Sequence, residues 1–239
     1  MGPHHYTIAL FSKEWFLSSG LTILLIVIGI IIGRKLSIDQ KERLGRITGW
    51  TLLGVALSGH LYLFWVNKWT IQSSLPLHLC GISAILSGIV LLKRHQLAYE
   101  CLYFWGIPGA FHSLLTPELT QGGEGYLYAD YFLSHGGIIL SALYLTMVLG
   151  MRPGVHSWWK IFLLTQVLAL VIGSINWALN SNYMYLCHKP IADNPLVMGD
   201  WPWYIAVFEL AAIVHFLLIY APFWWQDHKA KRRNSTKSA

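Results

Sequence analysis

Residues 15–33 read WFLSSGLTILLIVIGIIIG, an uncharged apolar run long enough to cross the hydrocarbon core of a bilayer. Similar runs recur along the chain, which is 55% apolar and 12% charged and has a mean hydropathy of +0.48. This composition excludes an ordinary soluble domain and predicts an integral all-α membrane protein. The expected spans are 15–33, 46–66, 75–92, 97–115, 131–149, 159–180 and 201–223. No small-residue cleavage motif accompanies the first run, so we interpret it as a retained span.

The distribution of Lys and Arg sets the expected orientation, because cytoplasmic loops retain positive charge. If the C-terminus is cytoplasmic, only Lys13, Lys68 and Lys189 of the 17 Lys and Arg residues lie outside. We therefore expect a seven-transmembrane helix bundle with its N-terminus outside and its C-terminus in the cytoplasm. Residues 1–225 would form one transmembrane domain, and 226–239 a basic cytoplasmic tail. The positive-inside pattern accounts for the net charge of +6, so we expect no nucleic-acid partner.

A layer of polar residues is expected at nearly one depth, in the outer third of the membrane, on every span but the first. Polar groups are costly in hydrocarbon, so such a layer is typical of a site that opens outward or sideways into the outer leaflet. Its members are His60, His78, Cys80, His112, His135, Asn176 and Glu209.

Cys80 is the candidate nucleophile of this layer, because it lies on a stripe of small and polar residues that marks a bundle-facing side. His78 is two residues away and points elsewhere on a helix, so it cannot pair with Cys80. A buried thiol needs an adjacent base to react, and His135 at similar depth is the first candidate. The alternative is an inert buried thiol among histidines that serve only as hydrogen-bond partners.

The other polar residues are candidates for supporting roles. Asn176, with Asn180 one turn on, could donate hydrogen bonds to an oxyanion. Glu209 is expected to be protonated or paired with a His, and it or His112 could orient the base. His60 and His78 remain possible pocket residues. His215 lies on a different face of its helix from Glu209, and we leave it out of the site.

A metal site is only weakly indicated. Zn²⁺ accepts histidine, thiolate and carboxylate ligands, but HxxxH, HxxE and CxxC spacings are absent. We assign no metal ligands and no cofactor. The three cysteines form no paired framework, although a disulfide between Cys80 and Cys187 stays open. Pro108, between Gly106 and Gly109, predicts a kink or opening of the fourth span about a turn below His112.

Five stretches of the chain, taken jointly, resemble the YwaF-like family of bacterial seven-span membrane proteins. They are SLPLHLCGIS (74–83), FWGIPGAFHSLLTP (104–117), FLSHGGIILSALYL (132–145), NWALNSNYMYLCHKP (176–190) and WPWY (201–204). The resemblance covers most of the chain from about residue 45 to 225. His78 departs from it, since relatives often carry Gln at that position.

The YwaF-like family is itself similar to the eukaryotic transmembrane protein 164, described as an acyltransferase that moves fatty acyl chains between phospholipids. The resemblance implies that Cys80 is the nucleophile and His135 its partner, that membrane phospholipid is the substrate, and that the protein is a multi-pass protein of the bacterial plasma membrane. The oligomeric state does not follow from it.

Two further functions stay open. A small-molecule or proton-coupled transporter would also bury Glu and His beside a broken helix, although the polar residues form one layer rather than a relay to the cytoplasm. A metal-dependent membrane lipid hydrolase would use the same histidines, Cys80 and Glu209 as ligands.

Overall fold

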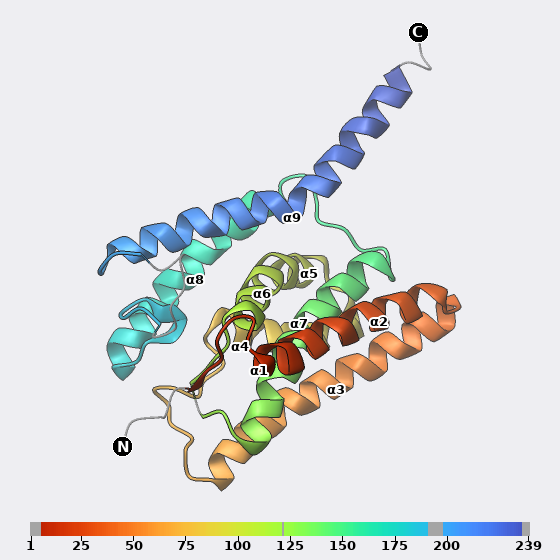
Figure 1. Cartoon of the computed structure of the whole chain (residues 1–239). Coiled ribbons are helices and arrows are strands. Elements are labelled where there is room, and N and C mark those ends of the chain that lie inside the picture. The colour runs from red at the N-terminus through yellow and green to blue at the C-terminus, as the bar shows by residue number, and fades with distance from the viewer. Residues whose placement is uncertain (1–5, 121, 191–197, 236–239) are drawn as a thin grey trace.

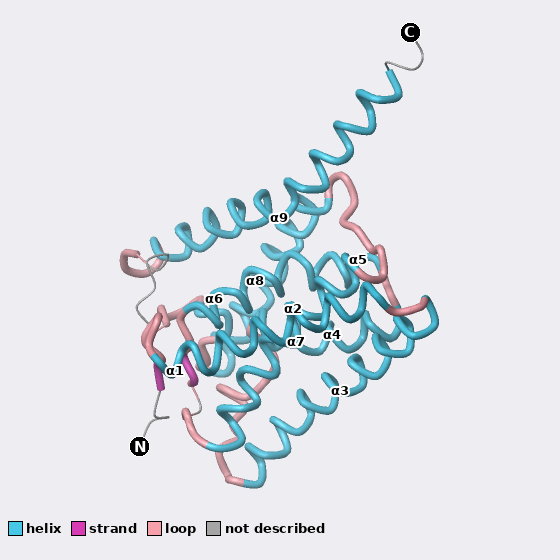
Figure 2. Tube along the Cα trace, turned by 45° about the vertical axis from the view of Figure 1, so that its right-hand side comes forward, coloured by secondary structure: helices cyan, strands magenta, loops and turns pink. Residues whose placement is uncertain are grey.

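The computed structural model describes residues 6–120, 122–190 and 198–235, and almost all its regular structure is helical (Figure 1). The helices are α1 (Lys13–Trp15), α2 (Leu21–Lys35), α3 (Ile38–Trp65), α4 (Leu79–Lys93), α5 (Gln96–Cys101), α6 (Ile107–Leu115), α7 (Gly125–Met147), α8 (Ser157–Leu179) and α9 (Trp203–Ser235). Two π-helical turns, Phe16–Gly20 and Leu102–Gly106, join α1 to α2 and α5 to α6, and a 3₁₀ turn spans Tyr183–Tyr185. The strands β1 (Tyr6–Thr7) and β2 (Glu118–Leu119) pair antiparallel. Figure 2 shows this strand pair at the same end of the molecule as α1.

Four helices in the described part of the chain are long and apolar enough to cross a membrane: Lys13–Lys35, Ile38–Trp65, Ser157–Leu179 and Trp203–Ala230. Leu79–Lys93 is a shorter apolar helix. Every expected span coincides with a helical stretch, so the all-helical, membrane-type fold expected from the sequence is confirmed.

The core lies around the continuous helical run from α5 to α6 and the middle of α7. Leu102 and Phe104 in the π-helical turn are fully buried, as are Ala142 and Leu145 of α7. Helix α7 contacts α2, α3, α4 and α6. The outward faces of α2 and α3 expose Leu, Ile and Trp side chains, as expected where a helix faces lipid rather than water.

Glycines allow α3 and α4 to approach closely. A Cβ atom at Gly88 of α4 would lie 2.8 Å from the carbonyl oxygen of Gly49 on α3, closer than real Cβ contacts. Small residues at helix interfaces permit this approach, and dispersion contacts then hold the two helices together.

Helices α8 and α9 form a pair beside this group, and both views show the C-terminal half of α9 projecting beyond the other helices (Figures 1 and 2). Glu100, 2% exposed, anchors the pair at one end. Its Oε1 accepts hydrogen bonds from Ser157 Oγ (2.6 Å) and Gly154 N (3.1 Å), and its Oε2 forms an ion pair with Lys160. A carboxylate at the N-terminus of α8 also complements the helix dipole.

Two sequence-based details change in the structure. The third expected span begins at residue 75, whereas α4 begins at Leu79, because Pro76 disfavours helical geometry in the residue before it and His78 is extended (φ −70°, ψ 148°). Cys80, Cys101 and Cys187 are free, so the disulfide that the sequence leaves open is not formed. The last four residues of the expected tail, 236–239, lie outside the described residues.

Candidate functional site

Cys80 lies in the first turn of α4, as the second residue of that helix. The first N–H groups of a helix have no intrahelical acceptor and stabilise nearby negative charge. Among the described residues, no side chain caps this end of α4. The thiol therefore lies next to backbone donors, an environment that the sequence pattern does not reveal.

Helix α6 brings a second set of groups to Cys80. The Cys80 Sγ lies 3.9 Å from Ser113 Oγ, and a Cβ atom at Gly109 would lie 3.2 Å from the same sulfur. Ser113 Oγ donates to the carbonyl of Gly109 (3.0 Å). Gly109 thus leaves space for the thiol, and Ser113, which the sequence analysis missed, is its hydrogen-bonding neighbour.

The break predicted at Pro108 is a π-helical turn over Leu102–Gly106, directly before the proline. Proline supplies no N–H, and a π-turn accommodates the missing bond by adding a residue to the turn. Because the added residue rotates all that follows, this turn sets the direction in which His112 and Ser113 point.

His135 lies in α7 and is oriented by its own helix. Its Nδ1 is 2.7 Å from the carbonyl oxygen of Tyr131, and the two rings lie 4.3 Å apart between centroids. When Nδ1–H donates to that carbonyl, Nε2 keeps its lone pair in the neutral ring and can accept a proton.

Tyr131 connects the surroundings of Cys80 and His135. Its hydroxyl donates to the carbonyl of Ser113 (2.8 Å) and accepts from the N–H of Glu118 (3.3 Å), while its ring packs on His135. It also lies close enough to Cys80 for the two groups to interact electrostatically. Within the described residues no hydrogen bond joins Cys80 to His135 directly. Tyr131 precedes His135 by four residues, a helical spacing that could have marked it in the sequence.

His78 is the residue directly before α4, and it contacts the loop that follows α8. Its Nδ1 accepts from the N–H of Met184 (3.3 Å), and its ring lies 5.4 Å from that of Tyr183 and 5.2 Å from that of Tyr185. Met184 and Tyr185 have left-handed φ values of 57° and 54°, which are strained for side chains of this size. The strained 3₁₀ turn thus brings the Tyr185 ring beside His78.

Asn176 and Asn180 support this turn at the end of α8. Asn176 is 1% exposed; its Nδ2 donates to the carbonyl of Tyr183 (2.9 Å), and its Oδ1 accepts from Tyr183 N and from Ser181 Oγ (2.8 Å each). Asn180 ends α8 in a left-handed conformation (φ 51°). Both residues lie where they shape the loop beside His78.

His112 and Glu209 belong to two separate polar pairs, one between α6 and α9 and one between α8 and α9. His112 Nε2 lies 3.0 Å from His215 Nε2, and Glu209 Oε2 accepts from Gln166 Nε2 (2.7 Å). His215, which the sequence analysis left out, is thus the partner of His112 across the α6–α9 contact. No sequence signal links the two histidines, because the expected spans place them at different depths.

His60 lies near the end of α3, where its Nδ1 accepts from Trp69 Nε1 (3.4 Å). No hydrogen bond or ring contact joins it to Cys80 in the described part of the chain. Among those residues, too, no group of three or more His, Cys, Asp or Glu side chains is arranged to hold a metal ion. The predicted polar layer is therefore divided into the region around Cys80, His78 and His135, the His112–His215 pair, the Gln166–Glu209 pair, and His60 with Trp69.

The long apolar helices define a multi-pass membrane protein. The model of the TMEM164 family matches residues 10–220, and the chain belongs to that family. It is also similar to an uncharacterized protein of Treponema pallidum (strain Nichols), with 27% identity over 211 residues that cover 87% of this chain and 85% of that protein. No solved structure matches the chain significantly.

Proposed function

We propose that the protein is a lipid acyltransferase that carries the acyl group as a thioester on Cys80. The proposal is carried by one observation: the Cys80 thiol lies in the first turn of α4 and next to Ser113. Tyr131 then contacts both Ser113 and His135. Membership of the TMEM164 family supports it, and the resemblance to transmembrane protein 164 would make Cys80 the nucleophile and His135 its partner.

The reaction would proceed in two balanced steps. His135 Nε2 takes the proton of the Cys80 thiol, and the thiolate attacks the carbonyl carbon of a phospholipid ester. The ester C–O bond breaks, and the leaving alkoxide takes the proton from the imidazolium. An acceptor hydroxyl, deprotonated by the same ring, then attacks the thioester and releases the thiolate. Proton transfer requires contact between the Cys80 thiol and the His135 ring. The thiol must therefore move from Ser113 to His135 when substrate binds, because catalytic hydrogen bonds often form only in the complex with substrate.

The oxyanion of each step needs hydrogen-bond donors. The first-turn N–H groups of Cys80 and Gly81 are the best-placed candidates, since they lie at the end of α4 that carries the nucleophile. Asn176 has its carboxamide engaged with Tyr183 and Ser181, and we assign it and Asn180 to shaping the loop rather than to the oxyanion.

The proposal includes the setting of this chemistry. Seven spans, with the N-terminus outside and the C-terminus in the cytoplasm, would place Cys80 and His135 toward the outer leaflet of a bacterial plasma membrane. The acyl chain of the phospholipid could then stay in hydrocarbon while its ester reaches the polar layer.

Intact-mass spectrometry of the purified protein after incubation with phospholipid tests the nucleophile. Wild-type protein is expected to gain a fatty-acyl mass that hydroxylamine releases, and Cys80→Ala is expected to gain none. Cys101→Ala is the matched control, since Cys101 is a buried thiol elsewhere in the core and its loss should leave the adduct unchanged. His135→Gln should slow adduct formation by about 10²-fold, the lower end of what a general base contributes.

An adduct that persists in Cys80→Ala, or that moves with Cys101, would show that Cys80 is not the nucleophile. Full acyl transfer by Cys80→Ala on the correct lipid would overturn the thioester mechanism altogether.

A further inference from the structure

Asp130 is a half-buried acidic residue in the second turn of α7, where its carboxylate packs against α3. A Cβ atom at Gly59 of α3 would lie 3.2 Å and 3.4 Å from the two carboxylate oxygens, so the missing side chain at Gly59 makes room for the acidic group. Figure 1 shows the end of α3 and the start of α7 at the same end of the molecule.

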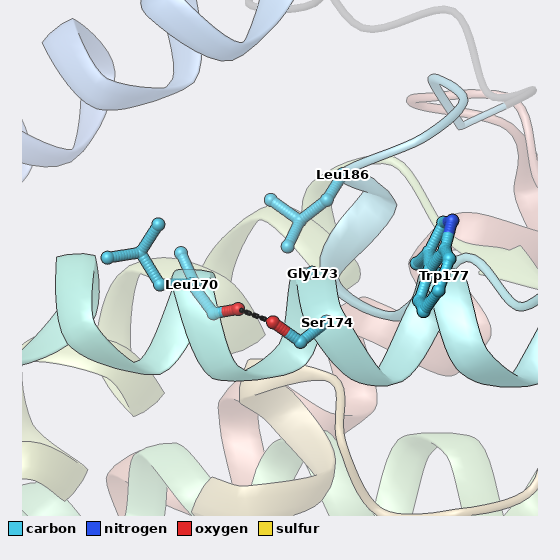
Figure 3. A pocket seen from close by; sticks show the side chains of 6 residues that line it. Leu170, Gly173, Ser174, Trp177 and Leu186 are labelled. Carbon is cyan, nitrogen blue, oxygen red and sulfur yellow. Dashed lines mark hydrogen bonds between the residues drawn. The ribbon is translucent and has the colours of Figure 1, made fainter.

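The Asp130 carboxylate lacks the partners that a buried charge needs. Its Oδ1 is enclosed and has no hydrogen-bond partner among the described residues. In the same part of the chain, no ion pair includes Asp130. Ser174, the polar side chain in the hollow on α8 drawn in Figure 3, differs in this respect, because it donates to the carbonyl of Leu170 (3.0 Å) and needs no ligand. A buried carboxylate oxygen without a partner is costly and therefore indicates a donor or cation that binds there.

The Tyr126 hydroxyl lies near this carboxylate but directs its hydrogen elsewhere. Ser58 Oγ donates to the carbonyl of Val55 (3.0 Å). The short hydrogen bond between Ser58 Oγ and Tyr126 Oη (2.6 Å) must then use the tyrosine hydrogen, because a serine hydroxyl has only one hydrogen to donate. Tyr126 therefore leaves the carboxylate free to accept from a ligand.

Aromatic rings complete the surroundings of Asp130. The rings of Tyr126 and Tyr62 stack with their centroids 4.6 Å apart. Tyr126 precedes Asp130 by four residues, so the two side chains are neighbours on the surface of α7. Tyrosine faces attract cations, and organic ammonium ions are their best-known partners. A carboxylate beside such rings favours an organic ammonium over a metal ion, which needs several more oxygen ligands.

The location indicates a lipid as the source of the ammonium group. Leu57 and Leu61 of α3 are 60% and 58% exposed, as expected for side chains that face hydrocarbon. Tyr62 directly follows Leu61, so the tyrosine pair borders this hydrocarbon-facing side. Trp65, farther along the same helix, is 78% exposed, as is typical of tryptophan at a membrane–water interface. A molecule that places an ammonium group here and its body in hydrocarbon is a phospholipid.

We propose that Asp130 and the Tyr62–Tyr126 pair bind the ammonium group of an ethanolamine phospholipid. A primary ammonium carries N–H groups that can donate to the unpaired carboxylate, whereas the quaternary ammonium of choline carries none. The site should therefore distinguish these two headgroups.

Helix α7 connects this headgroup site with the candidate site. Asp130 directly precedes Tyr131, whose ring packs on His135 and whose hydroxyl donates to the carbonyl of Ser113. A phospholipid held at Asp130 is thus bound on the helix that carries the proposed base. The inference rests on the proposed acyl transfer for its purpose, but headgroup binding is measurable without any reaction.

Native mass spectrometry of Cys80→Ala protein, titrated with phosphatidylethanolamine, phosphatidylcholine and phosphatidylglycerol of the same acyl chains, tests the site without acyl transfer. The ethanolamine lipid is expected to bind about tenfold more tightly than the other two, the lower end of what a hydrogen bond to a charged group contributes. Asp130→Asn keeps the shape and removes the charge, and should abolish this preference. Tyr62→Leu should weaken it. Asp200→Asn is the matched control, since the Asp200 side chain is 98% exposed, and should leave the preference unchanged.

Equal affinity for the three lipids, or an ethanolamine preference that survives Asp130→Asn, would overturn the site. A higher melting temperature of Asp130→Asn at unchanged lipid binding would overturn it too, because the carboxyl group would then be structural only. If Asp130→Asn does not fold, Tyr62→Leu and the lipid preference of the unaltered site decide. Soluble phosphoethanolamine that binds as tightly as the lipid would overturn the lipid as the source of the ammonium.

Two outcomes separate this inference from the proposed reaction. An ethanolamine preference without any acyl adduct on Cys80 in otherwise wild-type protein would overturn the reaction and keep the headgroup site. An acyl adduct that forms equally from the three lipids and is unchanged in Asp130→Asn would keep the reaction and overturn the headgroup site.

Discussion

The Asn176 carboxamide bonds both the N–H and the carbonyl of Tyr183, and so fixes the turn that carries Tyr185 beside His78. At the scale of single residues, members of the candidate site each make more than one structural contact. Tyr131 both orients His135 through its carbonyl and reaches Ser113 through its hydroxyl. A substitution here is therefore expected to change geometry as well as chemistry.

Asn176→Ala leaves the buried N–H of Tyr183 without a partner and its carbonyl with only the long hydrogen bond from Leu186 N (3.5 Å). We expect the melting temperature in detergent to fall by roughly 5–10 °C, since each such group costs about 1–3 kcal/mol and a chain of this size loses about 2–4 °C per kcal/mol. Ser181→Ala, which removes one bond to Asn176 and spares both bonds to Tyr183, should cause a smaller decrease. Lost acyl transfer at an unchanged melting temperature would instead restore the oxyanion role to Asn176.

At the scale of elements, the contact between α3 and α4 depends on glycines that let the backbones approach and that leave room for the Leu53 side chain. Gly49 and Gly88 face each other across it, and α4 carries Cys80 at its start. The position of the Cys80 thiol thus depends on how closely these two helices pack. The position of the Cys80 thiol also depends on α6, because the π-helical turn before Pro108 sets the direction in which Ser113 points toward the thiol.

Gly88→Ala places a methyl group 2.8 Å from the carbonyl oxygen of Gly49, so the helices must separate. Overpacking of this kind costs about 1–3 kcal/mol, and thermal unfolding in detergent should show a decrease of several degrees. Gly54→Ala is the control on α3, because nothing lies within 4 Å of its Cβ position and alanine favours the helix. Equal melting temperatures for the two variants would contradict close packing at Gly88.

At the scale of the whole molecule, the α8–α9 pair and the bundle around α7 enclose different polar groups. Cys80 and His135 belong to the bundle, whereas His112 of the bundle reaches His215 of the pair. Glu100 and Lys160 join the two groups of helices at the opposite end from the strand pair. The orientation of this assembly decides which leaflet supplies the substrate.

Accessibility labelling tests the proposed orientation. In protein without native cysteines, Lys189→Cys should react with a membrane-impermeant maleimide in intact spheroplasts, and Lys229→Cys only after lysis, because the two positions lie at opposite ends of the α8–α9 pair. Labelling of Lys229→Cys in intact spheroplasts would reverse the orientation and place Cys80 toward the cytoplasmic leaflet.

The sequence by itself determined the membrane class, the helical segments and the break near Pro108, because hydrophobic length, charge asymmetry and the missing proline N–H act locally along the chain. Only the tertiary structure decided that Cys80 starts a helix beside Ser113, that Tyr131 lies between Cys80 and His135, and that His215 pairs with His112. These relations join residues far apart in sequence across helix interfaces, and helical spacing specifies a face but not the partner that faces it.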